Sequence, residues 1–238
     1  MNPIVVAVAI AVTIGAVVAV SSRNARTALL GLAITVTAAP FLGDPLPQTS
    51  TLAMRVIGAA LVAFLLRSAA ASAVPTVNDP RPEAERLGSR VGWPAEALMA
   101  AAAWLVAIVV ASRLAALEPA GPGDGASDIL AMLGPAAVTT AAGLASIVVG
   151  FVPAFAGRDA LRTAIGMLIL IQGSFLLRAG VAGAPGDLEQ IAGVALFVAV
   201  AVAGATLISI EERHEPGVVP GNASIAPLPR TQRRRDGP

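Results

Sequence analysis

Seven mostly apolar segments constrain the fold of this chain more than any other feature, because each is about long enough to cross a lipid bilayer. A helix needs about 20 such residues to span a hydrocarbon core of roughly 30 Å. Backbone amides in lipid must be hydrogen-bonded within the spanning structure, so helices are strongly favoured over strands. The predicted spans are Pro3–Val20, Thr27–Gly43, Thr51–Ser68, Ala95–Leu117, Ile129–Phe155, Leu161–Val181 and Ile191–Ile210.

The composition agrees with a chain that is mostly embedded in lipid. Charged residues make up 13% of the sequence, whereas a soluble domain carries about 25%. Alanine and glycine are abundant in the apolar segments, and small side chains let helix axes approach closely. We therefore predict an all-α, polytopic transmembrane helix bundle at residues 1–210 and a disordered cytoplasmic tail at residues 211–238. Such a bundle has little room for a wide pore.

The charges of the connecting segments predict the orientation of the bundle. Arginine is concentrated in every second connection and in the tail, whereas the alternate connections are acidic or neutral. By the positive-inside rule, seven helices in this order place the N-terminus outside and the C-terminus in the cytoplasm. All sixteen basic residues are arginine, which with the high alanine content is typical of GC-rich bacterial coding, so we expect a multi-pass protein of the bacterial inner (cytoplasmic) membrane. The charges that carry this pattern are Arg23, Arg26, Arg81, Arg86, Arg90, Arg158, Arg162, Arg230 and Arg233 to Arg235, against Asp44, Glu118, Asp124, Asp128, Asp187 and Glu189.

A weak internal repeat relates the first three segments to the last three. Residues 23–28 resemble residues 158–164 when one gap is allowed, and each stretch leads through a glycine, Gly31 or Gly166, into an apolar helix. The match falls on the same helix of two three-helix groups, which predicts two parallel repeats joined by a central helix. The alternative is coincidence between two basic loops that precede apolar helices.

Three polar residues within the spans are candidate functional residues, because an ionisable group at the bilayer centre costs about 2.5–3.5 kcal/mol. Arg55, about one turn inside the third span, either extends to the headgroups or pairs with a carboxylate of a neighbouring helix or protein. Glu96 follows Pro94 at the start of the fourth span, where an acid complements the positive helix end; the alternative is an ion-linked carboxylate. Gln172, in the middle of the sixth span, is suited to an interhelical hydrogen bond, and the alternative is a proton or substrate contact.

No group of residues in the sequence predicts catalysis or cofactor binding. The single histidine, His214, lies beside Glu211 and Glu212 in the predicted tail, and one imidazole among solvated carboxylates rarely makes a metal site. Without cysteine, disulfides and thiolate-held metals are excluded. We find no nucleophile–base pair and no dinucleotide fingerprint. We therefore expect no catalytic residues, no bound cofactor or metal and no nucleic-acid partner.

The order of these features resembles a known membrane family. The stretches that carry the likeness are Gly157 to Arg162, Gly166 to Ser174 and Ile191 to Phe197, and Arg55 falls where that family tends to carry a basic residue. The family is component E of hydrogenase-4 and formate-hydrogenlyase-type complexes. It has seven helices in this order, and its last three helices are similar to the small K-type membrane component of complex I and to its counterpart in Mrp antiporters.

This resemblance implies a non-catalytic membrane subunit, at most one part of an oxidoreductase complex, packed beside antiporter-like membrane subunits in a hetero-oligomer. In that family, carboxylates in the last helices are thought to serve a proton path. Here the sixth span holds Gln172 and no acid, and the seventh holds Val194 where an acid is expected. A structural or docking role agrees better with this departure than proton translocation does.

Two alternatives come from other classes of protein. A stand-alone small transporter or channel would use the parallel repeats, and it requires a polar cavity near the bilayer midplane where broken helices meet. Polar residues at that depth are scarce, so a dry centre would argue against it. A membrane assembly or anchor protein is the second alternative.

Overall fold

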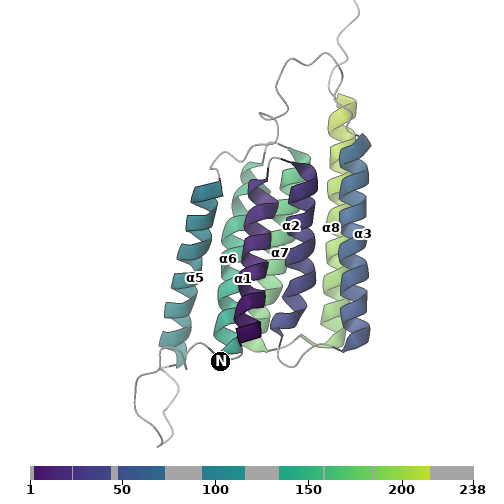
Figure 1. The fold of residues 1–238 in the computed structure, drawn as a ribbon. Coiled ribbons are helices and arrows are strands. Elements are labelled where there is room, and N and C mark those ends of the chain that lie inside the picture. The colour runs from purple at the N-terminus through teal and green to yellow at the C-terminus, as the bar shows by residue number, and fades with distance from the viewer. Residues whose placement is uncertain are drawn as a thin grey trace, which may run out of the picture.

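The structure is a computed structural model, and it describes residues 3–22, 24–43, 48–72, 93–115, 134–157, 159–183 and 185–214. Within these ranges the chain forms seven α-helices and no strand (Figure 1). They are α1 (Pro3–Ser21), α2 (Ala25–Ala38) with the 3-10 turn η1 (Ala39–Leu42), α3 (Thr49–Ser72), α5 (Trp93–Ala115), α6 (Pro135–Ala156), α7 (Ala160–Ala182) and α8 (Asp187–His214). The predicted all-α bundle is confirmed.

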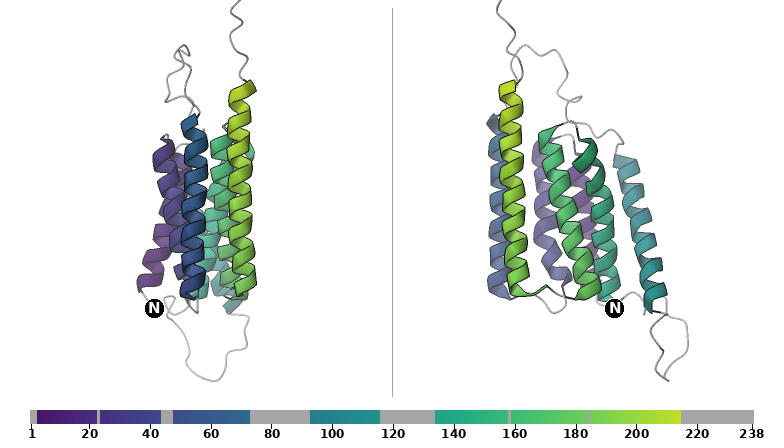
Figure 2. Two further views of the ribbon diagram at one scale, coloured as in Figure 1. Left: turned by 90° about the vertical axis from the view of Figure 1, so that its right-hand side faces the viewer. Right: turned by 180° about the vertical axis from the view of Figure 1, so that it is seen from behind.

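The helices run side by side along one axis and alternate in direction along the chain (Figures 1 and 2). We call the end that holds Pro3 and the start of α3 the lower end, and the end that holds Ser21 and the start of α7 the upper end. The helices α1, α2, α6 and α7 form the centre of the bundle. The pair α3 and α8 lies on one side of this centre, and α5 lies on the other, against α6 and α1 (Figure 2).

The length and composition of the helices show that the chain is an integral membrane protein. In the described part, six helices are long and apolar enough to cross a bilayer: α1, α2 with η1, α3, α6, α7 and α8. The seventh, α5, contributes a shorter apolar stretch at Pro94–Val110. Large apolar side chains such as Phe64 (66% exposed) and Leu105 (67% exposed) point outward, which suits a surface that lipid covers.

The interior is apolar and includes residues of all seven helices, among them Ala16, Leu32, Leu66, Ala103, Val149, Ile169 and Ala201. The buried hydroxyl groups bond to main-chain carbonyls. Thr35 Oγ1 donates to Gly31 O at 2.9 Å, Thr139 Oγ1 to Leu42 O at 2.9 Å, and Ser146 Oγ to Ala142 O at 2.8 Å. These bonds satisfy the hydroxyls without water, so the packed centre is dry at these positions.

The contacts between helices reveal the repeat, displaced by 135 residues. Gly31 packs so closely that an added Cβ would lie 2.6 Å from Ala19 N and from Gly15 O. In the same way, a Cβ on Gly166 would lie 2.5 Å from Ala154 N and 2.9 Å from Gly150 O. The displacement is the same for Gly15 to Gly150, Ala19 to Ala154 and Gly31 to Gly166. The pairs α1–α2 and α6–α7 therefore cross in an equivalent way.

The helix caps follow the same displacement. The Asn24 side chain caps α2 by accepting from Arg26 N at 2.9 Å, and the Asp159 side chain caps α7 by accepting from Leu161 N at 3.1 Å. Asx residues are favoured at this position because their oxygen satisfies a free amide of the first turn. The equivalence needs no gap, so the gapped alignment expected from sequence is replaced by an ungapped one.

Several helix ends differ from the predicted spans. The fifth span begins at Pro135 rather than Ile129, because proline suits the first position of a helix. The last helix continues to His214, four residues into the segment predicted as tail, since no proline interrupts it before Pro216. Some residues used to predict the orientation lie outside the described residues, as does the tail from Glu215: Arg23, Asp44, Arg81, Arg86, Arg90, Glu118, Asp124, Asp128, Arg158, Arg230, Arg233, Arg234 and Arg235.

Candidate functional site

Two adjoining cavities lie toward the lower end of the bundle, between α2 with η1, α3, α7 and α8. Both are lined by Arg55, Gln172, Phe175 and Gln190, and each offers a volume of about 30 Å³. A volume of this size holds about two water molecules, whereas sites for drug-sized ligands reach about 300–1,000 Å³. The cavities are therefore suited to water, a small ion or the tip of one side chain. We call them together the Arg55 cavity.

Arg55 reaches the cavity because α3 packs tightly on α8 one turn further along. A Cβ on Gly58 would lie 2.8 Å from Val194 Cγ1, so the absence of a side chain at Gly58 permits this approach. Arg55 is partly buried. No carboxylate in the described part of the chain forms an ion pair with it. Glu189, at the start of α8, pairs instead with Arg178 of α7, at 2.7 Å on the surface.

Gln172 comes from the middle of α7 and is buried, with 6% of its surface exposed. The sequence predicted an interhelical hydrogen bond for its amide. No such bond joins Gln172 to any residue that the structure describes, and the side chain lines both cavities instead. The structure thus brings together Arg55 and Gln172, which the sequence had singled out separately.

Gln190, in the first turn of α8, is the residue that the sequence analysis missed. It is 8% exposed, and its Nε2 donates to Pro185 O at 2.9 Å. This bond fixes the amide, and Oε1 is left buried without a hydrogen-bond partner in the described structure. Gln190 stands 135 residues after Arg55, so the ungapped repeat is the signal that pairs the two positions.

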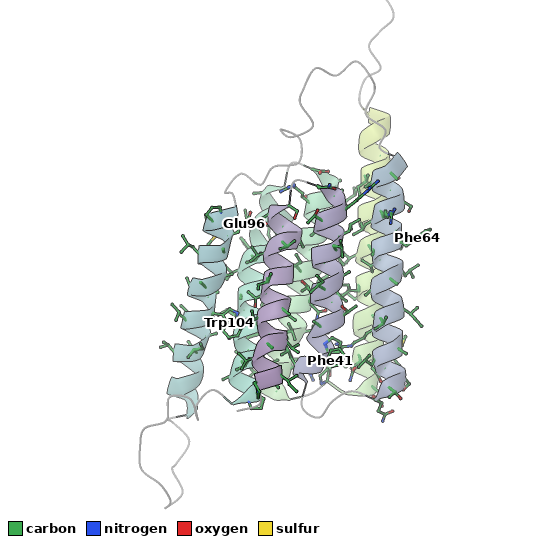
Figure 3. All side chains as sticks on the ribbon, in the orientation of Figure 1. Phe41, Phe64, Glu96 and Trp104 are labelled. Atoms are coloured by element: carbon green, nitrogen blue, oxygen red, sulfur yellow. The ribbon has the colours of Figure 1, made fainter. Side chains whose placement is uncertain are left out.

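Glu96 belongs to a different cluster, at the upper end of the bundle. Its side chain extends from α5 toward α1 and α6 (Figure 3) and is 1% exposed. Glu96 and Asp159 both attract the Arg162 guanidinium electrostatically. Arg162 donates hydrogen bonds to Val20 O at 3.2 Å and Ser22 O at 2.8 Å.

This upper cluster joins the end of α1, the start of α5 and the start of α7. A cation at the carbonyl end of α1 also complements the negative end of the helix dipole. Glu96 therefore does more than complement its own helix terminus, because it interacts with a cation from another helix. Three of the sequence-predicted residues thus divide into two places, with Arg55 and Gln172 in the cavity and Glu96 at the opposite end.

Neither place resembles a metal centre. Among the described residues, no group of three or more histidine, cysteine, aspartate or glutamate side chains converges on one point. Chemically, the Arg55 cavity offers positive charge and amide groups, and the upper cluster offers buried charges of opposite sign that compensate each other.

Comparison with known proteins adds no assignment. No family model matches the chain, and neither a curated protein nor a solved structure does so.

Proposed function

We propose that this chain is a non-catalytic integral membrane subunit with a structural or docking role in a complex-I-related or hydrogenase-4-like redox and ion-translocating complex. In this proposal it packs beside antiporter-like membrane subunits. The support from sequence is the resemblance in residues 157–162, 166–174 and 191–197. These segments lie in α7, in α8 and in the connection before α7, and α7 packs on both α6 and α8.

The observation that carries the docking role is Arg55. Its cation is partly buried in a bundle with an apolar interior, and no described carboxylate pairs with it. A positive charge in the membrane is costly unless another group compensates it. A neighbouring protein in the membrane can supply that group, whereas lipid tails cannot.

The same cavity favours docking over proton conduction. The resemblance leads one to expect acids in the last helices, yet Gln172 and Val194 both line the Arg55 cavity. An amide and an isopropyl group do not exchange protons near neutral pH. The side chains at the place where a proton path is expected therefore support a structural role.

A stand-alone transporter or channel is the second candidate, and the parallel repeat is the observation that favours it. Two observations weigh against it. The buried hydroxyls are bonded to main-chain carbonyls, and the Arg55 cavity holds only about four water molecules in its two parts. A membrane assembly or anchor role is compatible with the same fold.

Co-purification tests the proposal. The full chain, tagged at one terminus and extracted from its native membrane in a mild detergent, is expected to bring down large antiporter-like subunits in stoichiometric amounts. The Arg55→Gln variant is expected to recover less of these partners than Arg67→Gln, which removes an exposed cation from the same helix. Recovery of the wild-type chain only as a monomer or homo-oligomer would contradict the proposal.

A further inference from the structure

We propose that the Arg55 cavity binds a single carboxylate group. The group is carried either by a short free carboxylate such as acetate or by an acidic side chain on a membrane helix of a partner. The proposal does not depend on which complex contains the chain, because it rests on the cavity itself.

Charge is the first step of the argument. The cavity contains one guanidinium and, within the described structure, no carboxylate that pairs with it. Arginine presents a planar set of N–H donors that matches the two oxygens of a carboxylate. In a setting poor in water such a charge-assisted pair is stronger than one on an exposed surface. A small anion with two oxygens is therefore the complement of this cation.

Hydrogen bonding is the second step. The Gln172 side chain is buried, with only 6% of the residue exposed, and it has no hydrogen-bond partner among the described residues. It lines both parts of the cavity. Buried amides are normally bonded, so a group outside the described structure is needed to satisfy it. Its N–H donates to a carboxylate oxygen in the same space that Arg55 reaches. Two side chains from different helices therefore call for the same acceptor.

Gln190 adds a requirement for water. Its Oε1 is an acceptor, because Nε2 is engaged by Pro185 O, and it cannot bond to a carboxylate directly. A water molecule donates one hydrogen to Oε1 and the other to the bound anion. The two parts of the cavity, each about 30 Å³, have room for this water and for the two oxygens of one carboxylate. Larger anions such as nucleotides do not fit.

The first arm of the test uses free acetate and the purified full chain in detergent. Thermal unfolding is followed by circular dichroism in potassium acetate and in potassium chloride at equal ionic strength. Saturating acetate is expected to raise the midpoint of the wild-type chain by about 2–4 °C over chloride. Arg55→Gln is expected to lose this difference and Arg67→Gln to keep it, so a general salt effect is separated from binding.

A second variant keeps the test decisive if Arg55→Gln folds poorly. Gln172→Glu has nearly the shape of the wild-type residue and places a carboxylate inside the cavity. This variant is expected to unfold at a higher temperature in chloride than the wild-type chain does, and to gain nothing from acetate. A lower midpoint in chloride together with an unchanged acetate response would overturn the inference.

The second arm identifies the source of the carboxylate. A synthetic polyleucine membrane helix bearing one glutamate about two turns from its end is added to proteoliposomes, and binding is read by energy transfer. It is expected to bind the wild-type chain at least about tenfold more tightly than the matched glutamine peptide, and to lose this preference with Arg55→Gln. A response to acetate alone assigns the site to a free carboxylate, and a response to the peptide assigns it to a partner helix.

Failure of both arms in the wild-type chain overturns the inference. This includes the case in which Asp44→Asn creates an acetate response, because the occupant would then be the chain's own acid next to Gly43, which lines the cavity. Loss of binding in these purified systems is independent of the co-purification result, so the two proposals fail separately.

Discussion

The indole N–H of Trp104 donates a 2.9 Å hydrogen bond to the hydroxyl of Thr13, and this bond joins α5 to α1. The Thr13 hydroxyl itself donates to Ala9 O at 2.9 Å, so its oxygen is free to accept. The Trp104 ring also packs against both apolar clusters of the core and points into the bundle from α5 (Figure 3). The helix at the edge of the bundle is therefore held by one large side chain with a polar tip.

The first prediction concerns this contact. Trp104→Phe is expected to lower the free energy of unfolding by about 1–2 kcal/mol, because it removes the hydrogen bond and part of the ring. Thr13→Val is expected to cost about 1–3 kcal/mol, since it leaves the indole N–H without its acceptor. The double variant should cost less than the sum of the two. Unfolding in mixed micelles, followed by circular dichroism, measures all three.

Leu105 supplies the control for this series. It is the next residue of α5 and is 67% exposed, so Leu105→Ala is expected to change stability by less than about 0.5 kcal/mol. Equal losses for Leu105→Ala and Trp104→Phe would mean that α5 responds to any shortened side chain.

The second prediction concerns the upper cluster. Arg162→Met is expected to destabilise the bundle by about 2–4 kcal/mol, because Glu96 is then a buried acid without this cation and two carbonyls at the end of α1 lose their donor. Glu96→Gln alone should cost less, and adding it to Arg162→Met should recover part of the loss. Arg26→Gln is the matched control, since Arg26 is exposed in the first turn of α2. Additive losses for Glu96 and Arg162 would show that the two residues act independently.

Apolar length and loop charge were sufficient to predict the bundle, because each helix satisfies its own backbone and its hydropathy is a local property. The polar residues were harder to place. Arg55 and Gln172 were found one by one, since a polar residue in a span is visible in sequence. Their shared cavity depends on how α3 and α7 are rotated toward each other, and that is set by packing at Gly58 and other small residues.

Glu96 and Gln190 show the same limit from the other side. The position of Glu96 after Pro94 suggested helix-start chemistry, and the cation that it attracts, Arg162, is 66 residues further along the chain on another helix. Gln190 lies in an acidic first turn beside Glu189, where a glutamine attracts no attention. Only the displacement that relates Arg55 to Gln190 marks it, and the gapped alignment had hidden that relation.

The third prediction tests the close helix crossings of the two repeats. An alanine Cβ at position 31 would meet the main chain of α1 at 2.6 Å, and one at position 166 would meet that of α6 at 2.5 Å. Gly31→Ala and Gly166→Ala are therefore each expected to cost about 1–3 kcal/mol, in spite of the gain of about 1 kcal/mol in helix propensity. Gly186→Ala, where a Cβ meets nothing within 4 Å, is the control. Stabilisation by either helix variant would show that the crossings have room for a methyl group.

The last prediction fixes the direction of the bundle in the membrane. The chain has no cysteine, so a single introduced thiol reports its own position without background. Gly186→Cys lies at the lower end before α8, and Ser22→Cys lies at the upper end beside Arg23 and Arg26. Because arginine-rich connections remain in the cytoplasm, a membrane-impermeant maleimide added to intact cells or spheroplasts is expected to label Gly186→Cys and to spare Ser22→Cys until the membrane is opened. The reverse pattern would invert the bundle and move the Arg55 cavity from the outer half of the membrane to the inner half.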